Sequence, residues 1–150
     1  MRFALLAAAT GLALATPALA DDHMGVTAER HDHHATLKAA VASDVRGDDR
    51  ARDQYRHPFE TLDFFQVKPG MTVVDYMPAG GWYTRVLVPY LGSEGRYVGL
   101  TPDPAAADGE RFANYFSGLP GGFTESSPGW NLSGAPMSIY GSQDVPEAMQ

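Results

Sequence analysis

The residues best suited to chemistry surround a short glycine turn. Asp75 directly follows the β-branched run TVV at 72–74, and the segment PAGG at 78–81 comes shortly after it. In open α/β sheets, ligands bind beyond the carboxyl ends of the strands, and glycine lets the backbone approach a ligand closely. Thr101 and Asp103 follow the next apolar segment, where an acid commonly binds ribose hydroxyls. This spacing predicts a pocket for a nucleotide-like cofactor.

A second group of chemically active residues is the tract HDHH at 31–34. If the tract is helical, His31 and His34 lie three residues apart and could face one metal ion. Further ligands could come from His23, Asp32 or His57. The alternative is a solvated segment that binds metal only loosely, because no apolar residues surround the tract to form a packed second shell. We favour the solvated alternative and assign no metal ligand.

The first twenty residues have the three parts of an export signal in the usual order. Arg2 supplies a positive start, an apolar run covers 3–14, and Ala18 and Ala20 form a small-residue cleavage pattern. We therefore expect residues 1–20 to be a signal peptide cleaved after Ala20, and the protein to be exported to a periplasm or secreted. No later segment is long and apolar enough to span a bilayer, so we expect no membrane contact after cleavage.

Composition limits the classes of function. The chain has 150 residues, of which 44% are hydrophobic, and this suits about one globular domain. Its formal net charge is -7, and an acidic surface without a basic stripe argues against nucleic acid as a partner. The absence of cysteine excludes disulfides, thiolate metal sites and a cysteine nucleophile. The partner that we predict is a small-molecule ligand.

Residues 21–57 form a charged segment that we expect to be helical. Apolar residues four apart predict a short amphipathic helix over 35–45. Its stripe consists of Leu37, Val41 and Val45. Gly47 should end this helix, and the charged stretch 48–56 can form a further turn or two. Pro58 suits the first position of a new helix, which carries phenylalanines.

Residues 58–150 alternate strand and helix signals. We expect strands at 72–76 and 96–100 with a helix between them, which is a βαβ unit, and a weaker strand at 137–140. The uninterrupted β-branched run predicts a first strand buried on both faces. Aromatic residues in 111–119 should pack a helix on the sheet; these are Phe112, Tyr115 and Phe116. The predicted class is α/β, a partial doubly wound, Rossmann-like sheet preceded by short N-terminal helices.

The stretch YRHPFETLDFFQVKPGMTVVDYMPAGGWYTRVLVPYL, residues 55–91, resembles the N-terminal part of a family of exported proteins classed as predicted class I S-adenosylmethionine-dependent methyltransferases. The most specific shared element is GGWYT directly after the strand. The resemblance implies S-adenosylmethionine as cofactor and methyl transfer to an unknown acceptor. It implies that the chain corresponds to the N-terminal portion of a methyltransferase domain, 58–150, that is truncated. The catalytic residues stay unknown. The implied cofactor residues are Asp75, Pro78, Ala79, Gly80 and Gly81 beside the methionine part, with Thr101 or Asp103 near the ribose.

The chain departs from the usual glycine loop of that family. Counted from Asp75, the first two glycine positions hold Met77 and Ala79, and only Gly81 matches. We therefore expect weak binding of S-adenosylmethionine, and Gly80 with Gly81 could instead serve only a tight turn. The alternative function is an exported, non-catalytic binding module on a degenerate methyltransferase scaffold. A first strand left at a sheet edge would also favour strand-mediated self-association.

Overall fold

The computed structural model describes residues 23–147, with side chains described from His33 onward. The predicted signal peptide, residues 1–20, lies outside the described residues. Within 23–147, none of the helices has both the length and the apolar character needed to cross a membrane.

Four helical segments precede the sheet. They are α1 (His23–Ala42), the 3-10 helix η1 (Asp44–Arg52), α2 (Asp53–Arg56) and α3 (Pro58–Phe64). Gly47 interrupts η1 with a φ of 45°, whereas the helix that it was predicted to end, α1, already ends at Ala42. Pro58 begins α3 as predicted.

The predicted helix over 35–45 is wrong at both ends. Helix α1 begins at His23, so the charged tract before Ala35 is helical, and it ends before Val45. Leu37 is fully buried and Ala40 is nearly so, and their contacts hold the C-terminal half of α1 on the protein. Val45 lies beyond the helix and is 42% exposed, so it does not extend the apolar stripe.

A small parallel sheet forms the second part of the molecule. Its strands are β1 (Thr72–Tyr76), β2 (Arg96–Thr101) and β3 (Met137–Gly141), in the order β1-β2-β3. Both pairings are parallel, so all three carboxyl ends lie at one edge. The α/β class is thus confirmed, as a mixed fold with a three-stranded parallel sheet. All three predicted strands occur within one residue of their expected bounds.

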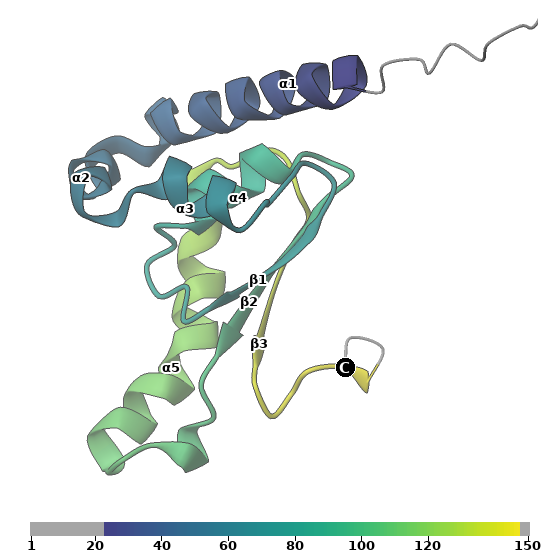
Figure 1. Ribbon diagram of the computed structural model, residues 1–150. Helices are drawn as coiled ribbons and strands as arrows, with labels where there is room; N and C mark the ends of the chain where they lie inside the picture. The colour runs from purple at the N-terminus through teal and green to yellow at the C-terminus, as the bar shows by residue number, and fades with distance from the viewer. Residues whose placement is uncertain (1–22, 148–150) are drawn as a thin grey trace, which may run out of the picture.

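Two helices cover one face of the sheet (Figure 1). Helix α4 (Thr84–Leu91) connects β1 to β2, and α5 (Glu110–Ser126) lies between β2 and β3. The Tyr97 side chain of β2 identifies the shared face, because its hydroxyl bonds to Thr84 of α4 and its ring stacks on Phe123 of α5. The short 3-10 helices η2 (Pro104–Ala106) and η3 (Ser127–Trp130) flank α5.

The prediction that β1 is buried on both faces is wrong. The strand lies at an edge of the sheet, and Val74 and Tyr76 are 57% and 60% exposed. They alternate with Val73 and Asp75, which are half-buried. Because α4 and α5 both lie on the Tyr97 face, the side chains of β1 that point the other way stay open to solvent.

The predicted aromatic face of the helix after β2 is also wrong in part. Phe112 and Tyr115 of α5 remain about half exposed, at 52% and 48%, and Phe116 is half-buried. Phe123, two turns further along, is the aromatic residue of α5 that packs into the core. The helix is longer than the aromatic cluster, so the packed residue fell outside the predicted segment.

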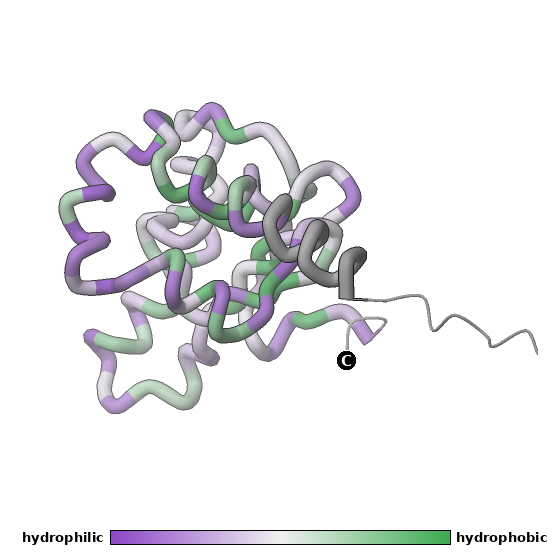
Figure 2. The backbone as a smooth tube through the Cα atoms, turned by 45° about the horizontal axis from the view of Figure 1, so that its top comes forward, coloured by the Kyte–Doolittle hydropathy of each residue, from purple (hydrophilic) through white to green (hydrophobic). Residues whose placement is uncertain are grey.

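The core lies between α4, the sheet and the N-terminal helices. Many of the hydrophobic segments lie in the interior of the molecule, and many of the hydrophilic segments lie on its outer turns (Figure 2). Helix α4 supplies much of the core, and α1 and α3 pack over it on the side away from the sheet (Figure 1). At the carboxyl edge of the sheet, the loop that follows β1 lies beside α5.

Candidate functional site

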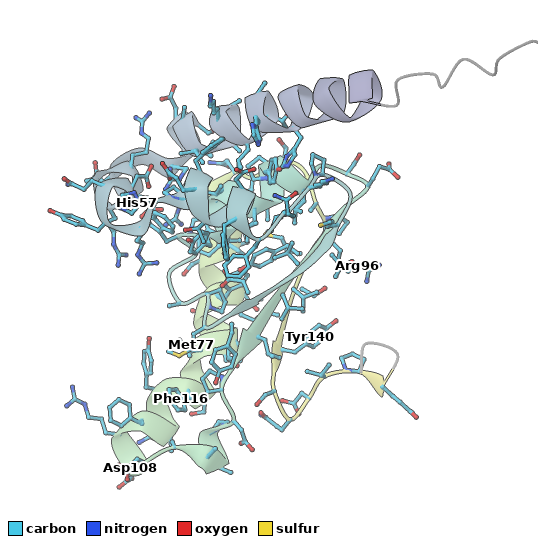
Figure 3. The ribbon with its side chains drawn as sticks, viewed as in Figure 1. His57, Met77, Arg96, Asp108, Phe116 and Tyr140 are labelled. Carbon is cyan, nitrogen blue, oxygen red and sulfur yellow. The ribbon has the colours of Figure 1, made fainter. Side chains whose placement is uncertain are left out.

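The loop after β1 has an unusual backbone. Met77, Ala79 and Gly81 all have positive φ, at 58°, 44° and 75°. For residues with a side chain, the left-handed region costs about 1 to 2 kcal/mol each, and such strain concentrates at functional sites. Two hydrogen bonds hold the loop: the N–H of Met77 donates to Leu100 O, and that of Gly81 donates to Pro78 O. Met77 lies beyond the end of β1, in the part of the molecule through which α5 runs (Figure 3).

A cavity of about 480 Å³ opens between this loop and α5. The loop contributes Ala79 and Gly80, and the remaining lining comes from one side of α5. These helix residues are Asn114, Tyr115, Gly118, Leu119, Gly122, Phe123 and Ser126. Among the described residues, neither the N–H of Ala79 nor that of Gly80 donates to a backbone carbonyl. The cavity therefore lies at the carboxyl edge of the sheet, between a loop with two N–H groups that have no backbone acceptor within 23–147 and a helix face that carries aromatic, apolar and small polar residues.

Asp75 is held by the core rather than by the cavity. The Tyr97 hydroxyl donates to Asp75 Oδ2 at 2.8 Å, and the same Tyr97 oxygen accepts from Thr84 Oγ1 at 2.8 Å. Burial raises the pKa of Asp75, although the Tyr97 hydrogen bond and the charge of Arg56 act in the opposite direction. Burial and the Asp75 carboxylate likewise raise the pKa of Tyr97. The hydrogen bonds that join Thr84, Tyr97 and Asp75 thus hold the end of β1 against α4.

The other predicted cofactor residues have different places. Pro78 is buried on the backbone of β2, because a Cβ built on Gly99 would lie 3.2 Å from Pro78 Cγ. Gly81 is buried against the Trp130 ring. The structure therefore brings two of the seven predicted residues to the cavity, Ala79 and Gly80.

Neither predicted ribose contact lines the cavity. Thr101 is 1% exposed, and its hydroxyl donates to Tyr140 O at 3.3 Å. Asp103 caps η2, since its carboxylate accepts from the Ala105 N–H at 2.8 Å. Both side chains therefore make hydrogen bonds to the backbone near the end of β2.

The α5 wall of the cavity was missed in the sequence, although a signal for it exists. Four small or polar residues recur every fourth position, which places them on one helix face. They are Asn114, Gly118, Gly122 and Ser126. Gly118 and Pro120 suggest an interrupted helix by propensity, but α5 continues through both. Because the side chains on this face of α5 are small or absent, space is left between α5 and the loop after β1.

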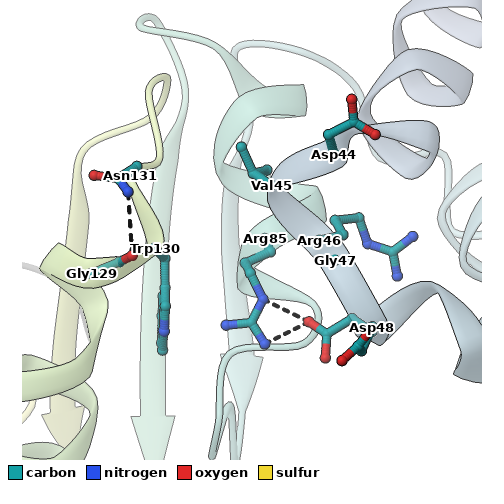
Figure 4. Close-up of a pocket in the computed structure, with 10 residues that line it drawn as sticks. Asp44, Val45, Arg46, Gly47, Asp48, Arg85, Gly129, Trp130 and Asn131 are labelled. Atoms are coloured by element: carbon teal, nitrogen blue, oxygen red, sulfur yellow. Dashed lines mark hydrogen bonds and ion pairs between the residues drawn. The ribbon is translucent and has the colours of Figure 1, made fainter.

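A second hollow, of about 430 Å³, lies between η1 and η3 (Figure 4). Its lining contains two arginines that are already paired. Arg85 Nε donates to Asp49 Oδ2 at 2.6 Å, and Arg46 binds both carboxylate oxygens of Asp53, at 2.6 and 2.7 Å. Because carboxylates of the chain neutralise these guanidinium groups, the hollow has little attraction for an anionic ligand. Its contacts instead join the N-terminal helices to the α/β part.

No protein-family model, curated protein or solved structure matches the chain. Function is therefore inferred from the residues of the chain itself.

Proposed function

We propose that this protein is a binding module for a nucleoside-sized small molecule, with S-adenosylmethionine as the reference ligand. The observation that carries the proposal is the cavity between the loop after β1 and α5, at the carboxyl edge of a parallel sheet. Ligands bind at this edge in open α/β sheets. A cavity of about 480 Å³ is also within the usual range for small-molecule sites.

The lining suits a ligand with an aromatic ring and a polar end. Tyr115 offers an exposed ring surface, and an aromatic side chain contributes about 1 to 3 kcal/mol when it stacks on a nucleic acid base. The backbone N–H groups of Ala79 and Gly80 are donors suited to a carboxylate or a hydroxyl. The strained backbone at Ala79 supports a ligand-binding role for the loop.

The resemblance extends this proposal to methyl transfer, as a second function of the same cavity. Methyl transfer needs mainly the close approach of sulfonium and acceptor, so it does not demand a strong base. However, the two predicted carboxylates are occupied elsewhere, Asp75 by Tyr97 and Asp103 by the cap of η2. Since S-adenosylmethionine is made in the cytosol and we expect this protein to be exported, we favour binding without catalysis. The proposal includes export, so that the ligand would be captured outside the cytoplasm.

Two glycines of α5 provide a matched test. Gly118 lines the cavity and Gly121 does not, yet a Cβ added at either would meet no atom within 4 Å. Leucine at either position raises helix propensity equally, by about 1 kcal/mol. In ligand-observed NMR with the full chain, S-adenosylmethionine should bind the wild type and Gly121→Leu but not Gly118→Leu. Equal binding to both variants would exclude this cavity, and no binding to the wild type would exclude this ligand.

Catalysis is tested separately with S-adenosylmethionine labelled on its methyl group. A binding module should form no S-adenosylhomocysteine above the rate of the buffer, whatever acceptor mixture is added. Production that depends on the protein and is lost in Gly118→Leu would instead support the methyltransferase function.

A further inference from the structure

A group of metal-binding side chains lies away from the cavity, between α1 and α3. One ligand atom from each of His33, His34 and Asp63 lies within 4.8 Å of the others. His34 Nε2 is 2.7 Å from Asp63 Oδ1, and all three side chains are partly exposed. We refer to these three residues as the histidine cluster. It shares His34 with the pair considered from the sequence, but it uses His33 and Asp63 instead of His31.

Tyr90 of α4 determines which ring nitrogen of His33 carries the proton. The Tyr90 hydroxyl donates its single proton to Val67 O at 2.8 Å, and the same oxygen contacts His33 Nδ1. With that proton used, the Tyr90 oxygen must accept from His33 Nδ1–H. The lone pair of His33 is therefore on Nε2, where it can bind a metal ion.

The contact between His33 Nδ1 and the Tyr90 oxygen is of the kind that supports metal-binding histidines. Metal-binding histidines generally donate their other ring N–H to an oxygen, which fixes the tautomer and the ring orientation. Here the rings are also packed: His33 stacks on Tyr90 with centroids 5.9 Å apart, and His34 meets the edge of Phe59 at 5.6 Å. The sequence offered no such second shell, because its residues come from distant parts of the chain.

We infer that the histidine cluster is a binding site for a divalent transition-metal ion such as zinc. Two imidazoles and one carboxylate suit zinc, and three protein ligands leave a fourth position for water. Two ligand atoms on a tetrahedral zinc ion lie about 3.3 Å apart, from bonds of about 2.0 to 2.1 Å. The His34 and Asp63 atoms must therefore separate slightly, and His33 must turn inward. The ion would join α1 to α3.

The site is tested with zinc alone and the full chain, by calorimetry. One zinc ion per chain should bind saturably, and Asp63→Asn, His33→Ala and His34→Ala should each weaken binding by at least about tenfold. Tyr90→Phe removes the acceptor for His33 Nδ1–H, and loss of such an outer partner costs about tenfold to a hundredfold in affinity.

Matched controls remove other histidines. The double variant His23→Ala, His31→Ala and the single variant His57→Asn should bind zinc like the wild type. His57 lies at the turn between α2 and α3, where its positive φ suits asparagine (Figure 3). Absence of saturable binding to the wild type would overturn the inference. So would binding that is lost in the His23 and His31 double variant but kept in Asp63→Asn.

A spectroscopic measurement avoids variants that unfold. Cobalt(II) bound to the wild-type chain should give visible absorption bands of nitrogen and oxygen coordination, which added zinc abolishes. In histidine ring 15N spectra, zinc should shift two imidazoles and leave the remaining three of the five histidines unchanged. Cobalt that gives only the spectrum of the hydrated ion, or zinc that shifts no imidazole, would contradict the site.

Discussion

Gly81→Ala should destabilise the protein through its contact with Trp130. Gly81 has a φ of 75°, and a Cβ built on it would lie 2.6 and 2.9 Å from Cζ3 and Cζ2 of the indole, and closer still to Cη2. The indole cannot move freely, because it meets Phe123 edge-on at 5.1 Å and lies under the Arg85 guanidinium at 4.9 Å. Gly81 is therefore needed for packing against Trp130.

The expected cost has two parts. The left-handed backbone contributes about 1 to 2 kcal/mol for alanine, and forcing the indole aside contributes about 1 to 3 kcal/mol. Alanine recovers about 0.4 to 1 kcal/mol by restricting the unfolded chain. The net loss in unfolding free energy should therefore be about 1 to 4.6 kcal/mol. Gly80→Ala is the matched control, since its Cβ would meet nothing within 4 Å and its φ is not positive. It should leave stability within about 1 kcal/mol of the wild type.

Urea unfolding of a double-mutant cycle separates the two parts. In a Trp130→Ala background the clash is gone, so Gly81→Ala should cost only the backbone part less the gain from restricting the unfolded chain, a net of about 0 to 1.6 kcal/mol. The coupling energy between the two positions should then be about 1 to 3 kcal/mol. The packing explanation is refuted if Gly81→Ala costs the same with and without Trp130, or if it is no worse than Gly80→Ala.

Three further predictions concern pH, the sheet edge and export. Burial raises the pKa of Asp75 in the folded protein above its ordinary value of 3.8, so the stability that Asp75 contributes is present at low pH and is lost as the pH rises through the folded pKa. In thermal melts at several pH values, the Asp75→Asn variant should lack this loss of stability. Parallel pH profiles for the variant and the wild type would contradict the prediction. Val74→Lys places a charge on the exposed edge strand β1 and should reduce self-association of the wild type in size-exclusion chromatography; an unchanged elution profile would exclude strand pairing there. Expression in a bacterium that exports proteins should yield a chain whose N-terminal sequence begins at Asp21, whereas an intact Met1 would contradict the signal peptide.

Local signals predicted much of the fold. The β-branched run before Asp75 and the proline at 58 each determine structure within a few residues, so the strand and the helix start were placed correctly. The mixed α/β class followed from the order of these elements. Burial was harder to predict. The run at 72–74 suits a central strand as well as an edge strand, and only the position of the other strands decides between the two.

The candidate site depended on contacts between distant residues. Gly81 meets Trp130, which lies 49 residues later, and no local pattern connects the two. The family resemblance assigned Gly81 to a cofactor, yet a glycine that admits a close side chain has the same sequence signal as one that admits a ligand. In the same way, the partner of His34 is Asp63, on a different helix. Residue types thus identified reactive groups, but tertiary packing decided their partners.

Helix α4 connects the cavity side of the protein to the histidine cluster. Its first residue, Thr84, bonds to Tyr97 and so to Asp75, and Tyr90 near its other end contacts His33. A helix of 8 residues is about 12 Å long and acts as a rigid connection. Energetic coupling between two sites requires an element with two arrangements. Most side chains of α4 are buried, and we expect this packing to hold the helix in one arrangement.

Zinc should therefore stabilise the fold without changing ligand affinity. At a free zinc concentration one hundred times the dissociation constant, binding adds about 2.7 kcal/mol to the free energy of unfolding. In thermal melts of the wild type, zinc should raise the midpoint, and Asp63→Asn should show no such rise. The affinity for S-adenosylmethionine, measured with and without zinc, should agree within about twofold. A larger change in affinity would mean that α4 has a second arrangement that the metal ion selects, because a ligand can shift an equilibrium only by its differential affinity for two states.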